Sequence, residues 1–342
     1  MNPSWRTAIE QSGGQVREDG TVAFGEIADG LTATQTGTVV APLADIGLLR
    51  VSGEDAMAFL QNLLTNDTQR QRPDQAQYNA MCSAKGRMLA NFIEWREGPD
   101  YLLQLSRDLH GPILKKLSMF VLRSKVKLSD AGDDYCVMGV AGSDAHTVVN
   151  ALGATLQTPM SVTPFADGTV IRLDERRYQV VARAQAAAGV WQQIATSARA
   201  VGTEVWHWLD IVAGIPRITG RTQEEFVPQM ANFELIGGVS FKKGCYPGQE
   251  IVARTQYLGK LKRRMYLATM NAPVAPQAGD QLYSPDLPEQ SCGMVVNAAP
   301  APGGGSDLLA VIQMSSADGG DVHLGSSDGP RLQFKSLPYA LN

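Results

Sequence analysis

The chain has 342 residues, 44 % of them hydrophobic and 19 % charged, and its formal net charge is −4. This length favours two or three domains, and the composition is that of a globular protein, which excludes a largely disordered chain. No apolar run approaches the ~18 residues of a membrane helix. The N-terminal stretch "MNPSWRTAIEQSGGQVREDG" has no apolar signal core, so we expect neither a membrane anchor nor export.

Two segments in the first two thirds of the chain share one pattern. Residues 48–64 and 137–153 each indicate a strand, then a G-x-D-A turn, then an amphipathic helix. We expect an acid or serine of each turn (Glu54 or Asp55, Ser143 or Asp144) to cap its helix. A further strand–helix unit follows each segment, at 100–120 and 177–196. This order predicts two related α+β halves with antiparallel sheets, and chance similarity of two capped helices is the alternative.

From about residue 263 the pattern changes to short apolar runs separated by Gly, Pro, Ser and Asp. Runs such as "RMYLATM", "CGMVV" and "DLLAVIQM" recur every ten to fifteen residues. They predict a small antiparallel barrel or sandwich. The stretch "APAPGGGSD" at 299–307 predicts a hairpin loop.

The four cysteines, at positions 82, 136, 245 and 292, form no C-x-x-C pair, and the four histidines are scattered. The spacing argues against a disulfide framework and against a zinc site built by this chain alone, and it favours a reducing, cytoplasmic compartment. Cys82, Cys136 and Cys292 stand among apolar neighbours, so we expect them to be buried.

Cys245 has a different setting, in "FKKGCYPGQE" at 241–250. Proline is favoured in the first turn of a helix and disfavours a helical residue before it, so Pro247 predicts a helix over 247–255. In that helix Ile251 and Thr255, with Leu258 beyond them, would face inward.

Cys245 would then lie at a helix N-terminus with Lys242 and Lys243 nearby, an arrangement that favours the thiolate. Gly244 and Gly248 would let a ligand approach the backbone. A buried structural cysteine is the alternative.

The same region is strongly basic. Residues 242–264 hold seven Lys or Arg and one acid, Glu250, against 23 bases and 33 acids elsewhere. A local positive excess on an acidic chain predicts an anionic partner, tRNA among the candidates. A solvated basic face is the alternative, above all for residues 260–264.

The string "KKGCYPGQEIVART", residues 242–255, closely resembles the K-G-C-[FY]-x-G-Q-E signature of the YgfZ family of folate-binding proteins. The similarity extends through 214–218, 226–241 and 257–265. Residues 59–68 and 78–95 are similar to elements of that family and of its relative, the glycine-cleavage T-protein, an aminomethyltransferase. The resemblance covers most of the chain.

This resemblance implies an α+β fold: two intertwined ferredoxin-like domains around a central opening, plus a small C-terminal β-barrel. On it we divide the chain into residues 1–130, residues 131–245 with the cysteine motif at their end, and residues 246–342. It also implies tetrahydrofolate or a derivative as cofactor. The partners implied are iron–sulfur client or assembly proteins, including tRNA-modifying enzymes.

The resemblance implies Cys245 as the reactive residue. The implied folate-binding set comprises Lys243, Gly244, Tyr246, Gly248, Gln249, Glu250 and Arg254 of the motif, together with Asn66, Tyr78, Met81, Lys85 and Asn91. Several alternatives stay open. Asn66 and Asp67 could equally cap a turn, and Arg254 could pair with Glu250 or reach a ligand. Trp206 and Trp208 fit a core position better than a pterin-stacking one.

One departure from the T-protein bears on the reaction. The T-protein carries a folate-assisting aspartate where this chain has Ala90 and Asn91, both uncharged. Glu94 would project from the opposite strand face. A neutral amide cannot act as a carboxylate base.

The leading hypothesis is therefore a tetrahydrofolate-binding accessory protein in iron–sulfur cluster assembly or repair, more an accessory factor than an enzyme. The alternatives are a folate-dependent aminomethyl transferase or demethylase, and an RNA- or protein-binding module using residues 242–264. One cysteine cannot supply the four ligands of a cluster, so any cluster contact would be shared.

Overall fold

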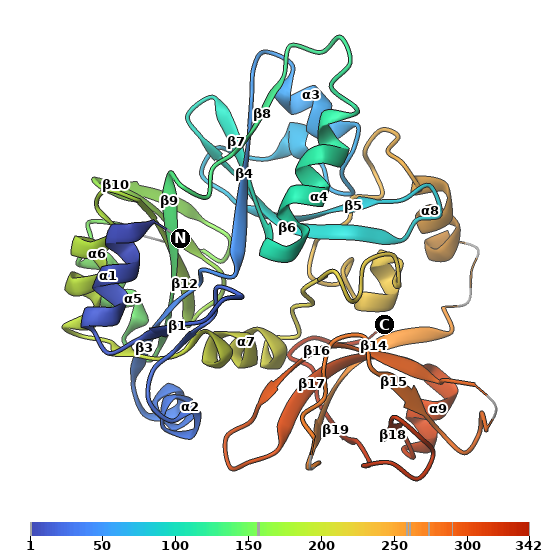
Figure 1. Ribbon diagram of the computed structural model, residues 1–342. Coiled ribbons are helices and arrows are strands. Elements are labelled where there is room, and N and C mark those ends of the chain that lie inside the picture. The colour runs from blue at the N-terminus through green and yellow to red at the C-terminus, as the bar shows by residue number, and fades with distance from the viewer. Residues whose placement is uncertain are drawn as a thin grey trace. The chain divides into compact units, whose positions relative to one another are not determined.

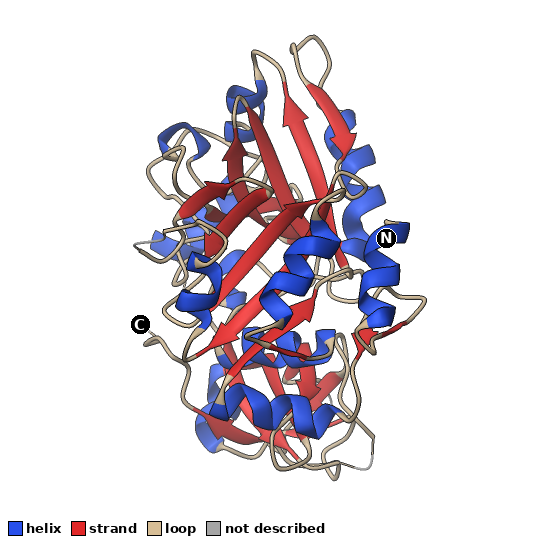
Figure 2. Cartoon of the chain, turned by 90° about the vertical axis from the view of Figure 1, so that its left-hand side faces the viewer, coloured by secondary structure: helices blue, strands red, loops and turns tan. Residues whose placement is uncertain are grey.

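A computed structural model describes residues 2–155, 158–257, 259, 261–272, 274–288 and 290–341, with helices and strands mixed along the chain (Figure 2). It divides into two compact units. The first comprises Met1–Phe59, Arg70–Gln77 and Ile93–Trp206, and the second Leu60–Gln69, Tyr78–Phe92 and His207–Asn342. The domain boundaries at residues 130 and 245 stay a prediction. No helix in the described ranges is long and apolar enough to cross a membrane.

The two predicted α+β halves are present as repeated elements (Figure 1). The first repeat runs β4 (Ile46–Ser52), α3 (Ala56–Gln61), β5 (Gln77–Cys82), β6 (Met88–Glu97), β7 (Asp100–Ser106), α4 (Arg107–Ser118) and β8 (Lys127–Asp130). The second runs β9 (Tyr135–Gly142), α5 (Ala145–Asn150), β10 (Val162–Phe165), β11 (Gly168–Arg172), β12 (Arg177–Arg183), α6 (Ala187–Ala195) and β13 (Arg199–Ala200).

Strand order confirms that the halves are related. The sheets run β5-β6-β7-β4-β8 and β10-β11-β12-β9-β3-β13, so the first four strands correspond one to one. The strand β3 (Thr38–Pro42) precedes the first repeat in sequence but pairs with β9 of the second. This exchange makes the two halves intertwined.

The glycine of the shared G-x-D-A turn is required by geometry. Gly53 and Gly142 have φ of +111° and +132°, and a Cβ on them would lie 2.1 and 2.2 Å from a backbone oxygen. The predicted caps are not formed as expected. Asp55 instead accepts a hydrogen bond from the amide of Lys125 at 2.7 Å, and Asp144 precedes α5 without a side-chain cap bond.

Tryptophans and aliphatic side chains fill the core of the first unit. Trp5 of α1 (Pro3–Gln11) meets Trp191 of α6 edge-on, with ring centroids 5.4 Å apart. The smaller elements nearby are β1 (Gln15–Val16), β2 (Val22–Ala23), α2 (Ile27–Thr36) and α7 (Thr203–Val212). Trp206 of α7 is buried, as expected of a core residue.

The strand-rich C-terminal region is confirmed as a six-stranded antiparallel sheet of order β18-β15-β16-β17-β14-β19. Its elements are β14 (Arg263–Met270), β15 (Gln281–Tyr283), β16 (Gly293–Pro300), β17 (Ser306–Gln313), α9 (Met314–Gly319), β18 (His323–Leu324) and β19 (Gln333–Lys335). The predicted hairpin joins β16 to β17, with Pro300 opposite Ser306. Leu282, Val295, Leu308 and Ile312 lie in its core.

Candidate functional site

The helix predicted after Cys245 is present as α8 (Gln249–Tyr257), four residues beyond the cysteine. Pro247 and Gly248 form a turn ahead of it. The predicted inward face was wrong: Val252 is buried, while Ile251 is 40 % exposed. The side-chain amide of Gln229 donates to the carbonyl of Val252 at 2.7 Å, and this bond sets the side of α8 that packs. Leu258, also predicted to face inward, lies outside the described residues.

The four cysteines separate as predicted. Cys82, Cys136 and Cys292 are buried thiols, whereas Cys245 is an exposed one. Burial raises the pKa of Cys82 and of Cys136 to about 12 and that of Cys292 to about 11. These three stay protonated thiols near neutral pH, and Cys245 is the cysteine that a reagent or ligand can reach.

Lys243 faces the protein backbone. Its side chain is buried, and its ammonium donates to the carbonyls of Gln61 and Asn66 at 2.6 and 2.9 Å and to that of Leu64. An ammonium has three N–H donors, and all three are used here. The same ammonium lies 5.1 Å from the ring centroid of Tyr246. Lys243 therefore ties the cysteine motif to residues 61–66.

Asn66 also fixes the position of residues 61–66 through hydrogen bonds of its side chain. Its amide nitrogen donates to the carbonyls of Tyr78 and Gly237 at 2.8 and 2.7 Å, and its amide oxygen accepts from the backbone N–H of Asp67 at 2.9 Å. Asn66 was expected either to bind folate or to cap a turn, and these bonds are those of a turn-stabilising residue. Thr65 adds a hydroxyl donor to the carbonyl of Gly238 at 2.7 Å.

Gly248 brings the β5–β6 turn against the motif. Its φ is +79°, and an added Cβ would lie 2.3 Å from the carbonyl oxygen of Ser83 and 2.7 Å from the Cα of Gly86. The expectation that Gly248 leaves room for a ligand is corrected: its bare backbone is needed for packing. Lys85 lies in this turn and is exposed. A Cβ on Gly244, by contrast, would meet nothing within 4 Å.

The remaining predicted residues differ in exposure. Tyr78, Met81 and Tyr246 are buried, and burial raises the pKa of Tyr246. Gln249 is half-buried, whereas Glu250 and Arg254 are exposed on α8. Within the described part of the chain Glu250 and Arg254 form no ion pair with each other.

The basic stretch is less basic at the surface than in the sequence. Lys243 is buried, and the guanidinium of Arg264 is buried in an ion pair with Glu234 and donates to the carbonyl of Gln229 at 3.0 Å. Lys242 and Lys262 are exposed, and Lys260 lies outside the described residues. Two of the seven cations thus point into the protein, and for Arg264 the alternative of a solvated basic face over residues 260–264 was wrong.

Asn91 occupies a second location, on β6. Its amide nitrogen donates to the carbonyl of Pro216 and its amide oxygen accepts from the N–H of Ile218, both at 2.8 Å. It pairs with residues 216–218 as one backbone peptide would pair with another. Ala90 is fully buried. In β6, Glu94 is an odd number of positions from Asn91, so their side chains leave opposite strand faces, as expected.

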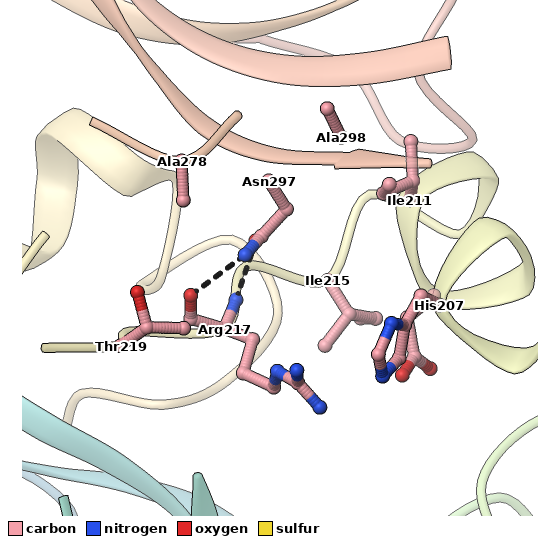
Figure 3. Close-up of a pocket in the computed structure, with 9 residues that line it drawn as sticks. His207, Ile211, Ile215, Arg217, Thr219, Ala278, Asn297 and Ala298 are labelled. Atoms are coloured by element: carbon pink, nitrogen blue, oxygen red, sulfur yellow. Dashed lines mark hydrogen bonds between the residues drawn. The ribbon is translucent and has the colours of Figure 1, made fainter. Parts of the chain in front are cut away.

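Ile215, Arg217 and Thr219 of the same loop line a pocket of about 130 Å³ (Figure 3). Its polar lining consists of His207, Asp210, Arg217, Thr219 and Asn297. Asn297 fixes the floor by bonding both the backbone N–H and the carbonyl of Arg217 at 2.8 Å. The guanidinium of Arg217 extends toward His207, so a cation, an imidazole and a carboxylate meet in one small cavity.

Sequence reasoning missed this pocket, because its lining comes from four separate parts of the chain: α7, the following loop, Ala278 and β16. Residues 214–218 of this loop ("GIPRI") belong to the family similarity, but Arg217 among them was not predicted to be a site residue. His207 and Asp210 are three apart in "HWLD", a helical i, i+3 spacing that places both on one face. That spacing was the available signal.

Residues 10–166 match the family described as the GCVT N-terminal domain. The tRNA-modifying protein YgfZ of Klebsiella pneumoniae (strain 342) is 31 % identical over 304 residues, which cover 87 % of this chain and 92 % of that protein. The chain belongs to the YgfZ family. The YgfZ protein of Escherichia coli (strain SMS-3-5 / SECEC) is 29 % identical over 302 residues, with the same coverage.

A solved structure extends the YgfZ assignment to the fold. The glycine cleavage system aminomethyltransferase T from Bartonella henselae superposes with a TM-score of 0.80 over 98 % of this chain and 96 % of its own, at 14 % identity. At this identity the likeness shows the fold alone. The chain thus has the aminomethyltransferase-like fold that the resemblance implied.

Proposed function

We propose that this chain is a tetrahydrofolate-binding accessory protein that supports iron–sulfur enzymes, including tRNA-modifying ones, with Cys245 as its reactive thiol. Membership in a family whose relatives are named tRNA-modifying proteins supports the setting. The observation that carries the proposal is the contrast among the cysteines: the one inside the family motif is exposed, and the other three are buried.

The folate would be held by polar groups that point into a cavity. The side-chain amides of Asn66 and Asn91 are hydrogen-bonded to backbone groups. We therefore assign these two residues the role of positioning the backbone segments that they bond. The pocket beside Arg217 has a group suited to the pterin end: its carboxylate, Asp210, can accept N–H bonds from the pterin ring. Its volume of about 130 Å³ suits one end of a folate only.

Asn91 argues against aminomethyl transfer as the main activity. A neutral amide held at both ends by Pro216 and Ile218 has no proton-accepting carboxylate to offer. The accessory role needs no such base. It needs a bound folate and an accessible sulfur.

Cys245 would act as a ligand or nucleophile through its sulfur, after loss of the thiol proton. A cluster normally takes four protein ligands, so this residue would supply one and a client protein or a small thiol the others. We place this chemistry in the cytoplasm, where a reducing environment keeps cysteines as thiols. A tRNA contact through residues 242–264 would rest on the exposed cations Lys242, Arg254 and Lys262.

Two measurements separate the parts of this proposal. In calorimetric titration with tetrahydrofolate, wild type and Cys245→Ala should bind equally, whereas Asp210→Asn should bind roughly tenfold more weakly, because a neutral amide is a poorer acceptor. Absence of heat with wild-type protein would remove folate from the proposal.

The thiol is tested in a strain that lacks the native protein. Cys245→Ala should fail to restore the activity of iron–sulfur enzymes, whereas Cys292→Ala, at a buried position, serves as the matched control and should restore it if the variant folds. Full rescue by Cys245→Ala would remove the thiol from the mechanism. Before this, iodoacetamide should modify one cysteine of the native chain, and peptide mapping should locate it at position 245.

A further inference from the structure

The loop between α4 and β8, residues 119–126, exposes three large apolar side chains. Met119 is 70 %, Phe120 41 % and Leu122 88 % exposed. Scattered single apolar residues on a surface need no explanation, but here three are exposed within four positions of one short loop. We call Met119, Phe120 and Leu122 the apolar tip.

The apolar tip is not part of the hydrophobic core beneath α4. The apolar face of α4 is buried through Leu109, Ile113 and Leu117. The chain then leaves the helix at Met119, and the tip residues follow beyond the buried stripe. Folding of this unit therefore does not need the tip to be apolar.

The loop is held in a defined shape. Backbone N–H groups of Phe120, Val121 and Ser124 donate to carbonyls three residues earlier, at 3.0, 3.3 and 2.8 Å. Leu122 has a φ of +44°, a left-handed conformation that an ordinary L-residue adopts at a cost of about 1–2 kcal/mol. A strained leucine is thus kept with its side chain almost fully in solvent.

Positive charge surrounds the tip. Residues 109–129 contain five Lys or Arg and no Asp or Glu, although the whole chain has a net charge of −4. Lys115 and Arg123 are exposed beside the tip. Two acids of the same repeat join them: Glu54 binds the ammonium of Lys125, and Asp55 accepts from the backbone N–H of Lys125, both at 2.7 Å. The rim is therefore mainly cationic, with two acids in it.

We propose that the apolar tip and its cationic rim form a docking surface for a second protein, one whose contact face has a small apolar depression bordered by carboxylates. Met, Phe and Arg are enriched at the centres of protein interfaces. Complementary rim charges accelerate encounter and fix orientation, while the buried apolar anchor supplies most of the affinity. This surface is independent of the folate and cysteine assignments.

The composition of the surface favours a protein over RNA or a bilayer. Two of the three tip side chains are aliphatic and offer no ring on which a base could stack. A helix lying on a membrane needs an exposed apolar face, and the face of α4 is buried. Glu54 at the rim would repel phosphates, whereas a protein surface can meet it with a cation.

The test places a photo-crosslinking residue, p-benzoylphenylalanine, at position 122 in the full-length chain inside cells, and at Val274 as the control. Val274 is a comparably exposed apolar residue, at 74 %. Each protein crosslinked from position 122 alone is then purified and titrated with wild type, Leu122→Asn, Arg123→Glu and Val274→Asn, at low and at high salt.

We expect Leu122→Asn to weaken binding of the purified partner at least tenfold, and Val274→Asn to leave it unchanged. Arg123→Glu should weaken it mainly at low salt, because salt screens rim charges. No adduct specific to position 122, or equal binding by Leu122→Asn and Val274→Asn, would overturn the proposal.

Three further outcomes would overturn it in a different way. Binding of total tRNA, or of phosphatidylcholine vesicles with phosphatidylglycerol, that Leu122→Asn abolishes would assign the tip to RNA or to a membrane. A dimer in sedimentation that Leu122→Asn dissociates would make the occupant a second copy of this chain.

Discussion

The cysteine motif and the α4–β8 loop both depart from the usual distribution of side chains, in opposite directions. At the motif, the charged Lys243 is buried and its ammonium donates to three backbone carbonyls. In the α4–β8 loop, Leu122 is apolar, strained and exposed. Burying a charged side chain and exposing a strained apolar one both cost free energy, and the two costs are compensated differently.

Comparing the two regions distinguishes residues that support the fold from residues that contact a partner. The carbonyls of Gln61, Leu64 and Asn66, at and beyond the end of α3, are buried or partly buried and need donors, so a lysine there is accounted for by the fold itself. Nothing in the fold accounts for Leu122. A polar residue whose donors are all used inside the protein indicates positioning, and an apolar residue left outside indicates a partner.

Lys243→Met should have the largest effect on stability. Three carbonyls, one of them in a buried bond and two in part-buried bonds, would lose a charged donor, at a cost of about 3 kcal/mol. Denaturant unfolding measures this as a lower midpoint. Lys242→Met, at the exposed neighbouring position, should stay within about 0.5 kcal/mol of wild type. If the two variants unfold alike, Lys243 does not hold the motif.

Gly248→Ala should rank next. The left-handed backbone costs alanine about 1 kcal/mol, and its Cβ would lie 2.3 Å from the oxygen of Ser83, so we expect a loss of about 2 kcal/mol in thermal or denaturant unfolding. Gly244→Ala is the matched control, because its Cβ meets nothing within 4 Å. Equal stability of the two would show that the β5–β6 turn does not pack on Gly248.

These same residues show how much of the fold and of the site could be predicted from the sequence. The strand–helix repeats were predictable because period and turn chemistry are local, and Gly53 and Gly142 mark them. The partners of Lys243 were not, since Gln61 and Leu64 lie 182 and 179 positions away in sequence. The pocket lined by Asp210 and Asn297 escaped for the same reason. Local pattern finds elements, and long-range pairing decides which way a side chain faces.

Asn91→Asp should destabilise the protein in a pH-dependent manner. An ionised aspartate cannot donate to the carbonyl of Pro216, whereas the protonated acid can. Repulsion by the Pro216 carbonyl and the partial burial of this position favour the protonated form and raise the carboxyl pKa above its ordinary value of about 3.9, while the N–H of Ile218 offsets part of this shift.

For such a group, stability is retained below the unfolded-state pKa and lost as pH rises through the folded-state pKa. We expect Asn91→Asp to lose about 1–2 kcal/mol between about pH 4 and about pH 7 in denaturant titrations, relative to wild type. A parallel pH profile for the two proteins would contradict the bond to Pro216.

Leu122→Asn should have the smallest effect, and of opposite sign. Asparagine tolerates the left-handed region better than leucine does, so the variant should gain up to about 1 kcal/mol or remain unchanged. Met119→Asn is the control, because Met119 is similarly exposed but has an ordinary φ of −67°, and it should gain nothing. Calorimetric melting of the two variants checks this. A clear loss of stability in Leu122→Asn would mean that the leucine serves the fold after all, and the contrast between the two loops would then disappear.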